Sequence, residues 1–140
     1  RHEWHQNLSR RSFLSHTAQF AAFSVPVPVS ALGITVITKC EIMRARCENL
    51  LMAADGLLLL QAQQRLSRTE QLLGKLTVIP IDQMSVQQFD RLRTAKKLKK
   101  CGRPDLLIAS IALANSATLV TRNVQHFRQI PNLAVEDWVA

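Results

Sequence analysis

Glycine is scarce in this sequence, and its scarcity excludes two common classes of enzyme. Only four glycines occur among the 140 residues. None of them forms a glycine-rich phosphate loop, and no serine stands in the Gly-x-Ser-x-Gly turn that presents a catalytic nucleophile. The sequence therefore argues against a nucleotide-binding loop and against a hydrolase of the serine-elbow type.

Cysteine is also rare, and Cys40, Cys47 and Cys101 show no Cys-x-x-Cys spacing. Because clustered histidines are missing too, the pattern favours reduced thiols in the cytoplasm over a zinc site or a disulfide framework. No run of the sequence approaches the roughly 18 apolar residues of a membrane span, so no membrane partner is expected. A chain of 140 residues, 47% of them hydrophobic, fits one soluble α/β domain.

Acidic residues are nearly missing from the first part of the chain. Only Glu3 precedes Glu41, and the first aspartate is Asp55. No alternating apolar strand is apparent before Val25, and two prolines within residues 25–29 favour an extended connector. We expect residues 1–32 to be a divergent N-terminal segment outside a domain formed by residues 33–140.

Positive charge is concentrated within residues 91–103, which carry seven of the basic side chains and no acid, in a chain of net charge +8. Such a cluster favours a polyanionic partner, because each neutralised phosphate releases counterions. A solvated helix face kept soluble by its charges is the alternative interpretation. The members of this basic segment are Arg91, Arg93, Lys96, Lys97, Lys99, Lys100 and Arg103.

One carboxylate, Asp105, opens a stretch that has no other charge before Arg122. Pro104 suits a first helical turn, and residues 106–114 are apolar on nearly all sides, which predicts a buried helix. Asn115 and Ser116 should end it, and residues 117–120 read as a short buried strand. Asp105 at the helix start and the polar residues after the strand can thus line one ligand crevice, although an acid in this position also suits the helix dipole.

Glu41 has a similar setting. Residues 34–38 form a β-branched run that predicts a strand, Thr38 is a candidate N-cap, and Glu41 follows three residues later as in a capping box. This spacing explains the glutamate by helix capping as readily as by metal binding.

The remaining pattern alternates helices and strands, which predicts a mostly parallel sheet with helices on its faces. Val86, Phe89 and Leu92 should face the core, Trp138 should form an apolar plug, and His126 should be packed beside Phe127. The expected elements are helices over residues 41–54 and 57–73 joined by a turn at Asp55-Gly56, a cap at Gly74, a strand over 76–81, a helix from Asp82 or Ser85 to about 98, a loop over 99–102, a helical turn over 124–128 and a strand over 133–135.

Two segments carry a resemblance to a known family. Residues 102–123 read GRPDLLIASIALANSATLVTRN and are followed by His126-Phe127, Ile130-Pro131 and a terminal Val-Glu-Asp-Trp, while residues 34–46 read ITVITKCEIMRAR. In this order they resemble PIN-domain proteins of the VapC toxin family, over about residues 33 to 140. The resemblance implies a PIN-like three-layer α/β/α fold with a mostly parallel sheet.

The resemblance also implies a function, namely an endoribonuclease dependent on Mg²⁺ or Mn²⁺ that acts as the toxin of a toxin–antitoxin pair. Glu41, Asp105 and Asn123 would be the catalytic residues and metal ligands, and Thr121 would support their loop by hydrogen bonding. The implied partners are RNA, an antitoxin protein and a second copy in a homodimer. RNA would bind along Lys96, Lys97, Lys99, Lys100, Arg103 and Arg122.

The family pattern begins with a strand that ends in an aspartate, and this sequence has no such residue before Glu41. We therefore expect the first strand to be missing or replaced, through truncation, a wrong start or degeneration of the coding sequence, and the nuclease to be weak or inactive. A catalytically dead PIN-like protein that binds RNA or an antitoxin is one alternative. A small basic DNA-binding regulator is another, supported by the basic segment but lacking a helix-turn-helix pattern.

Overall fold

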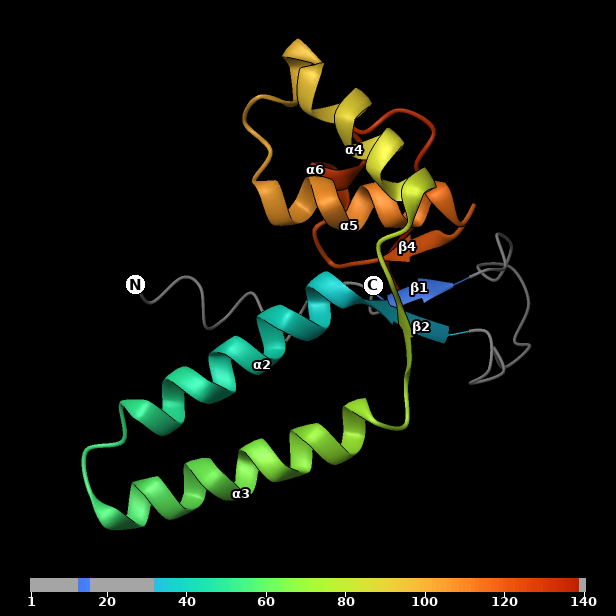
Figure 1. Cartoon of the computed structure of the whole chain (residues 1–140). Helices are drawn as coiled ribbons and strands as arrows, with labels where there is room; N and C mark the ends of the chain where they lie inside the picture. The colour runs from blue at the N-terminus through green and yellow to red at the C-terminus, as the bar shows by residue number, and fades with distance from the viewer. Residues whose placement is uncertain (1–12, 16–31, 139–140) are drawn as a thin grey trace.

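The computed structural model of the chain describes residues 13–15 and 32–138 (Figure 1). Helices and short strands alternate along it, as the sequence pattern predicts. The elements are β1 Phe13–Ser15, β2 Leu32–Thr35, α2 Val36–Leu51, α3 Gly56–Leu73, β3 Thr77–Ile79, α4 Gln83–Thr94, the 3-10 helix η2 Lys96–Leu98, α5 Arg103–Ala114, β4 Thr118–Val120, α6 Val124–Phe127 and β5 Val135–Glu136.

The strands form one five-stranded sheet in the order β3-β2-β1-β4-β5. β2 pairs in parallel with β3, and β4 with β5, whereas β1 is antiparallel to both of its neighbours. All strands except β1 therefore run in one direction, and their carboxyl ends meet at one edge. Figure 1 shows α4, α5 and α6 above the sheet and the α2–α3 hairpin below it, which is the PIN-like three-layer arrangement.

β1 corrects one expectation from the sequence. No strand was expected before Val25, yet Phe13–Ser15 takes the central position of the sheet, with Phe13 opposite Val120 and Ser15 opposite Thr118. Its direction is reversed, so its carboxyl end lies at the edge opposite to the carboxyl ends of β2 and β4. The segment at residues 25–29, interpreted as a connector, lies outside the described residues.

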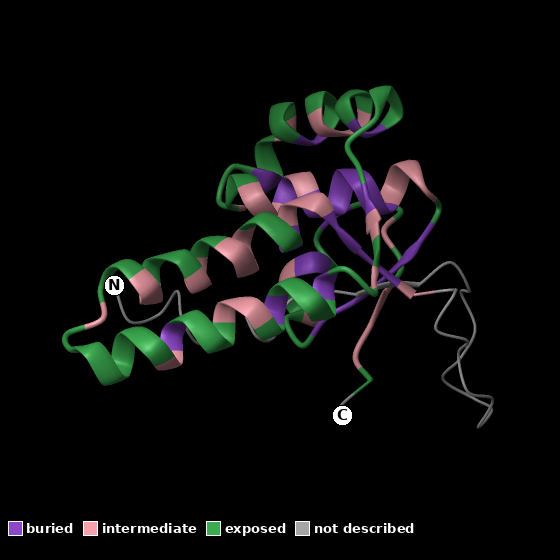
Figure 2. Cartoon of the chain, turned by 60° about the horizontal axis from the view of Figure 1, so that its bottom comes forward, coloured by how far each residue is buried: buried purple, intermediate pink, exposed green. Residues whose placement is uncertain are grey.

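The core is built around α5, as its all-round apolar pattern predicts. Ile108, Ala109, Ile111 and Ala112 have no exposed surface. α5 packs against α4 and β4, and burial is concentrated on α5 and the strands while the far end of the α2–α3 hairpin is exposed (Figure 2). Full burial of a side chain such as Ile108 stabilises the fold by about 1.5–3 kcal/mol.

Two predicted core positions are wrong. Val86 is 46% exposed, because Asp82 caps α4 and the inward face of that helix runs through Ser85, Phe89 and Leu92 instead. Trp138 is not a plug but is 42% exposed, and its Nε1 donates a hydrogen bond to Glu136 Oε2 at 2.9 Å. Residues 36–38, which were expected in a strand, instead begin α2, five residues before the predicted start of that helix; the other elements agree with the sequence pattern to within a few residues at their ends. Within residues 13–15 and 32–138, no helix is long and apolar enough to cross a membrane.

Candidate metal and nucleic-acid site

Three chain segments meet at the sheet edge where the parallel strands end. α2 begins directly after β2, and the loop from Thr121 to Asn123 follows β4. α5 runs back along the sheet to the same edge, because Asp105 Oδ2 on its first turn lies 3.0 Å from His126 Nε2 on α6. Crevices at this edge are the usual ligand sites of α/β sheets, so the fold places the candidate residues where binding is expected.

Asp105 occupies the first turn of α5, as predicted. Gly102 is the N-cap and Pro104 lies in the first turn, so neither supplies a side-chain cap. The Asp105 side chain is only 15% exposed, and it contacts His126 from another helix. The helix dipole by itself favours an acid at this position. It does not account for the contact between Asp105 and His126 on α6.

Glu41 is not a capping residue, which corrects one interpretation of the sequence. The N-cap of α2 is Thr35, whose Oγ1 accepts from Thr38 N at 3.1 Å, so Thr38 is inside the helix and not its cap. Thr35 and Thr38 also join their hydroxyls at 3.0 Å, and both are buried. Because the helix begins at Val36, Glu41 lies beyond its first turn and cannot complete a capping box.

The Glu41 side chain is instead partly buried. Its Oε2 is buried from solvent. α2 contacts α5, the helix that carries Asp105. Glu41 therefore lies on the helix that packs against the helix carrying Asp105, with one carboxylate oxygen shielded from solvent.

The loop after β4 is organised by Thr121. This residue is buried, and its Oγ1 accepts a hydrogen bond from Asn123 N at 3.1 Å. Asn123 is the N-cap residue of α6, but its side chain makes no capping hydrogen bond. The amide of Asn123 and the side chain of Arg122 are both exposed at the same edge.

His126 is the residue at this edge that the sequence interpretation undervalued. Phe127 is packed in the core as expected, with 1% exposure, and the two rings meet edge to face with centroids 5.2 Å apart. His126 Nε2 lies 3.0 Å from Asp105 Oδ2, and the side chain of His126 is 24% exposed. Its position three residues after Asn123 on a one-turn helix was the available clue, because such spacing puts both residues on one side of the turn.

The types of donor atom at this edge suit a divalent cation, but few protein ligands are available. Glu41, Asp105, Asn123 and His126 supply oxygen and nitrogen donors. The part of the chain that the structure describes nevertheless holds no group of three or more His, Cys, Asp or Glu side chains suited to one metal ion. The reversed β1 explains part of this shortage, because its carboxyl end lies at the opposite edge.

The basic segment leads directly into α5, whose first turn lies at this edge. All seven of its basic side chains are exposed. Leu98 is 2% exposed and anchors η2 to the core, so the lysines on either side of it remain at the surface. Arg103 lies with its guanidinium carbon 5.0 Å from the centre of the Phe89 ring, at the start of α5.

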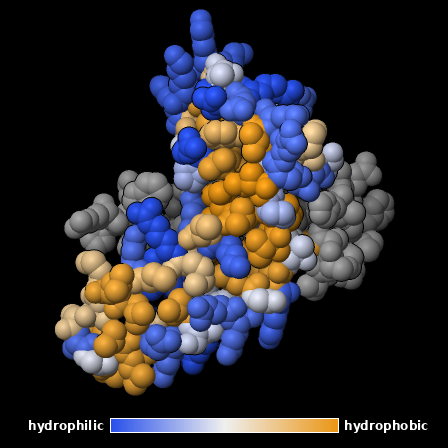
Figure 3. Space-filling view, viewed as in Figure 1, coloured by the Kyte–Doolittle hydropathy of each residue, from blue (hydrophilic) through white to orange (hydrophobic). Residues whose placement is uncertain are grey.

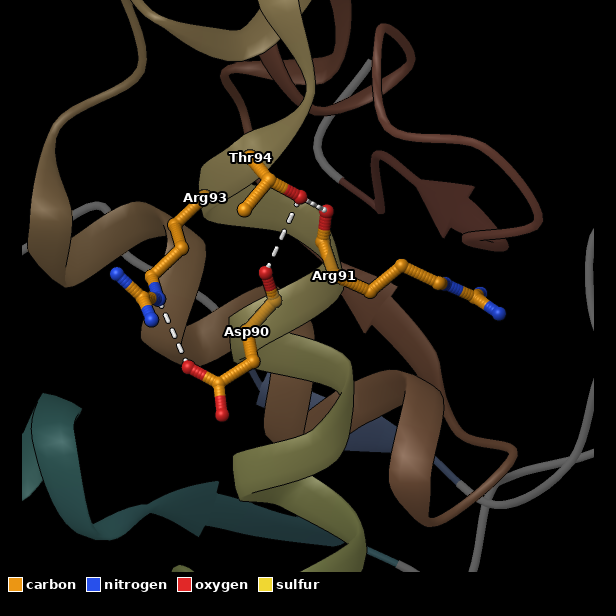
Figure 4. A network of polar contacts seen from close by, with 4 residues as sticks. All are labelled: Asp90, Arg91, Arg93 and Thr94. Atoms are coloured by element: carbon orange, nitrogen blue, oxygen red, sulfur yellow. Dashed lines mark hydrogen bonds and ion pairs between the residues drawn. The ribbon is translucent and has the colours of Figure 1, made fainter.

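The end of α4 is fixed by polar contacts of its own (Figure 4). Arg93 Nε donates to Asp90 Oδ1 at 2.7 Å, and Thr94 Oγ1 donates to the backbone carbonyl of Arg91 at 2.9 Å. Arg93 is therefore paired with an acid, Asp90, that lies just outside the basic segment of residues 91–103. The side chain of Arg91 extends away from Asp90 in the same view.

Cys101 separates the lysines from α5. Burial raises the pKa of Cys101, and the negative charge of Asp105 raises it further. A raised pKa keeps this thiol protonated at neutral pH. Cys40 and Cys47 are exposed free thiols on α2.

Comparisons with known proteins support one family. No family model matches the chain. Ribonuclease VapC2 of Rickettsia felis is 40% identical over 78 residues, which are 54% of this chain and 58% of that protein. Ribonuclease VapC1 of Haemophilus influenzae is 48% identical over 48 residues, which are 31% of this chain and 36% of that protein.

Two solved structures are similar in fold. The VapBC2 structure from Rickettsia felis, bound to a DNA fragment from its promoter, contains a chain with a TM-score of 0.59 and 32% identity, and the match covers 76% of this chain and 74% of that one. The VapBC-1 structure from nontypeable Haemophilus influenzae gives a TM-score of 0.61 at 25% identity, covering 77% and 75%.

A mostly parallel sheet between helical layers, with acid-bearing helices at its carboxyl edge, defines a PIN-like domain. The chain belongs to the VapC family of PIN-domain toxins. It spans 58% of the length of the Rickettsia relative and 36% of the Haemophilus relative.

Proposed function

We propose that the protein is a metal-dependent endoribonuclease of the VapC type, the toxin of a toxin–antitoxin pair in the cytoplasm. The observation that carries the proposal is the position of Asp105. Its carboxylate is largely buried, it meets α6 at the carboxyl edge of the sheet, and it follows directly after the exposed basic segment. An acidic site beside a basic surface suits cleavage of a phosphodiester better than simple binding, because the acids alone would repel the backbone of a nucleic acid.

Each part of the site has a defined task in this proposal. Glu41, Asp105 and Asn123 are the catalytic residues and hold Mg²⁺ or Mn²⁺. When bound, the ion supplies Lewis acidity to the scissile phosphodiester and to the attacking water. Thr121 keeps Asn123 at the edge through its hydrogen bond to the Asn123 backbone.

RNA is the proposed substrate, and the exposed basic side chains next to the site bind its phosphates. Lys and Arg contacts of this kind give affinity without sequence preference. Arg122 lies on the loop that also carries Asn123, so it is placed to contact a phosphate near the scissile bond. The binding residues are Lys96, Lys97, Lys99, Lys100, Arg103 and Arg122, all of them exposed.

A catalytically dead relative that binds RNA or an antitoxin is the second candidate. The observation in its favour is the reversed β1, which directs its carboxyl end away from the site. With two carboxylates in place of the family's three, we expect weak binding of Mg²⁺ and weak cleavage.

An antitoxin is the proposed protein partner, and the end of the α2–α3 hairpin is its proposed contact. Figure 3 shows apolar side chains gathered there on the surface. A contiguous exposed apolar patch marks an interaction surface. A second copy of the chain, as in the homodimer that the family resemblance implies, is the competing occupant. This hairpin tip consists of Leu51, Met52, Leu57, Leu58, Leu59 and Leu60, which are 44–84% exposed.

Asp105→Asn tests the nuclease directly, since the replacement keeps the shape of the side chain and removes only its charge. The matched control is Asp90→Asn on α4, because Asp90 pairs with Arg93 at the surface. Single-stranded RNA is incubated with each variant in Mn²⁺, in Mg²⁺ and in chelator. We expect chelator-sensitive cleavage by the parent chain and by Asp90→Asn, and none by Asp105→Asn.

Either of two results contradicts the assignment. Equal cleavage by Asp105→Asn and the parent would make Asp105 a helix-terminus charge only. No cleavage by the parent in either metal, with RNA still bound, would favour the catalytically dead candidate.

A further inference from the structure

Trp138 lies exposed at the same edge of the sheet as the candidate site. β5 runs parallel to β4, with Glu136 opposite Val120, and Thr121 N donates a hydrogen bond to the backbone carbonyl of Glu136 at 2.9 Å. Trp138 therefore follows the carboxyl end of β5 just as Arg122 follows that of β4. Its side chain is 42% exposed, which leaves a large apolar surface beside a polar edge.

Contacts between elements connect Trp138 to the site. β5 contacts α6, and His126 Nε2 on α6 lies 3.0 Å from Asp105 Oδ2. The loop that joins β4 to α6 carries Arg122 and Asn123, and both are exposed. Neighbouring strands lie about 4.8 Å apart, so an RNA bound at this loop has nucleotides close to the end of β5.

One hydrogen bond restrains the orientation of the indole. Trp138 Nε1 donates to Glu136 Oε2 at 2.9 Å, so the only polar group of the ring is satisfied within the protein. A partner at this position then meets the apolar part of the ring and not its N–H group. A side chain that is already restrained also loses less freedom when a partner binds.

We propose that Trp138 stacks on an unpaired base of the RNA, so that the substrate class is an unpaired segment and not a duplex. This inference rests on the proposed function, which supplies RNA as the substrate. Proteins bind single strands by stacking bases on aromatic side chains beside a positively charged path, and every base has a face that can stack. In a duplex those faces are covered by the neighbouring base pairs, so Trp138 selects unpaired segments.

The charges around Trp138 favour a base over a phosphate at this position. Glu136 and Asp137 precede the indole in the chain, and their carboxylates repel the phosphates of an RNA backbone. Arg122 on the neighbouring loop is exposed and attracts them. The backbone is therefore held on the side of Arg122, and a base is directed to the ring.

A protein partner is the competing occupant of Trp138. Protein interfaces use contiguous apolar patches, such as the leucines of the hairpin tip. Along residues 121–138, by contrast, Trp138 is the only large hydrophobic side chain that is exposed. A single aromatic ring among polar and charged neighbours suits a nucleic-acid base better than a protein surface.

Fluorescence anisotropy with chelator present tests the stacking contact. The ligands are a labelled single-stranded RNA, a strand of the same length with abasic nucleotides, and a duplex. Loss of one stacked base weakens binding about 5–150-fold, so Trp138→Ala should lose this much affinity for the single strand, and Trp138→Phe should keep most of it. Trp138→Ala should bind the abasic strand and the duplex as the parent does. The matched control is Leu72→Ala on α3, at a 60% exposed apolar site, which should change nothing.

The dependence on salt separates stacking from charge. Stacking releases no counterions, so Trp138→Ala should weaken binding equally at every salt concentration and leave the slope unchanged. Equal losses on the abasic and ordinary strands, equal losses in Trp138→Ala and Trp138→Phe, or no loss at all would overturn the inference. Release of a co-expressed antitoxin by Trp138→Ala with RNA affinity intact would assign Trp138 to the protein partner.

Intrinsic fluorescence avoids dependence on a Trp138 variant that fails to fold. Trp4 and Trp138 are the two tryptophans of the chain, so Trp4→Phe leaves Trp138 as the only indole. Single-stranded RNA should quench its emission and the abasic strand should not; equal responses to both strands would count against stacking.

The outcome is separable from that of the nuclease test, because binding is measured without cleavage. Stacking without cleavage in Mg²⁺ or Mn²⁺ would refute the nuclease and leave this inference intact. Cleavage by a parent whose RNA affinity does not depend on Trp138 would do the reverse. Absence of any RNA binding by the parent would contradict both.

Discussion

Replacing Lys96, Lys97, Lys99 and Lys100 by glutamine should flatten the salt dependence of RNA binding. All four side chains are exposed around the buried anchor Leu98, so the replacements remove charge and leave the packing of η2 in place. Each phosphate neutralised on a single strand contributes about 0.7 to the slope of log affinity against log salt, so four contacts contribute up to about 2.8. Between 50 and 200 mM salt, the variant should lose about 50-fold less affinity than the parent.

The assay is fluorescence anisotropy of a labelled single-stranded RNA at several salt concentrations, with chelator present to prevent cleavage. A control with the same loss of charge elsewhere separates local contacts from net charge. An unchanged slope in the lysine variant, or equal flattening in the control, would refute RNA binding by this segment. The control replaces Lys39, Arg65, Arg68 and Lys75, which are exposed on α2, on α3 and just after α3.

Three further predictions follow from the packing and the surface. Ile108→Ala should lower the free energy of unfolding in urea by about 2–5 kcal/mol, whereas Val86→Ala, at a 46% exposed site, should change it by less than about 0.5 kcal/mol; equal effects would contradict the assigned face of α4. Hydrogen bonds from Ser85 lower the pKa of Asp82 below 3.8, so the stability that its charge adds is present above pH 3.8 and is lost as the pH falls through the lowered pKa. The difference in thermal midpoint between the parent and Asp82→Ala should therefore shrink in acid. The double variant Leu57→Lys, Leu60→Lys should release a co-expressed antitoxin while the mass of the chain alone, from light scattering, stays unchanged; a fall in that mass would assign the hairpin tip to a homodimer.

The sequence by itself determined α5 and the position of Asp105 on it. An uninterrupted apolar stretch that follows Pro104 and ends at Asn115 and Ser116 allows only a buried helix, and the structure confirms both ends. The helical hairpin was equally local, since Asp55 caps α3 through a hydrogen bond from Leu58 N, and Gly74 ends that helix. Caps and periodicity act over a few residues, so they can be recognised without knowing the rest of the fold.

The start of α2 shows where local patterns stop being sufficient. Residues 34–38 suit a strand by β-branching, yet the strand ends at Thr35 and the helix begins at Val36. The end of β2 is set by its neighbours β1 and β3 in the sheet, and Thr35 becomes the cap because it is the residue at which the chain leaves that sheet. Because Thr35 is the N-cap, Glu41 lies too far along α2 to complete a capping box.

Only the tertiary structure decided the remaining features of the site. β1 is three residues long, and nothing in its own sequence indicates that it enters the centre of the sheet in reverse. The approach of His126 to Asp105 joins helices that are separated by β4 in the chain, and the rotation of α6 is fixed by the burial of Phe127. Contacts between distant segments depend on how the whole core packs, and that information is not contained in the spacing of residues along any one of them.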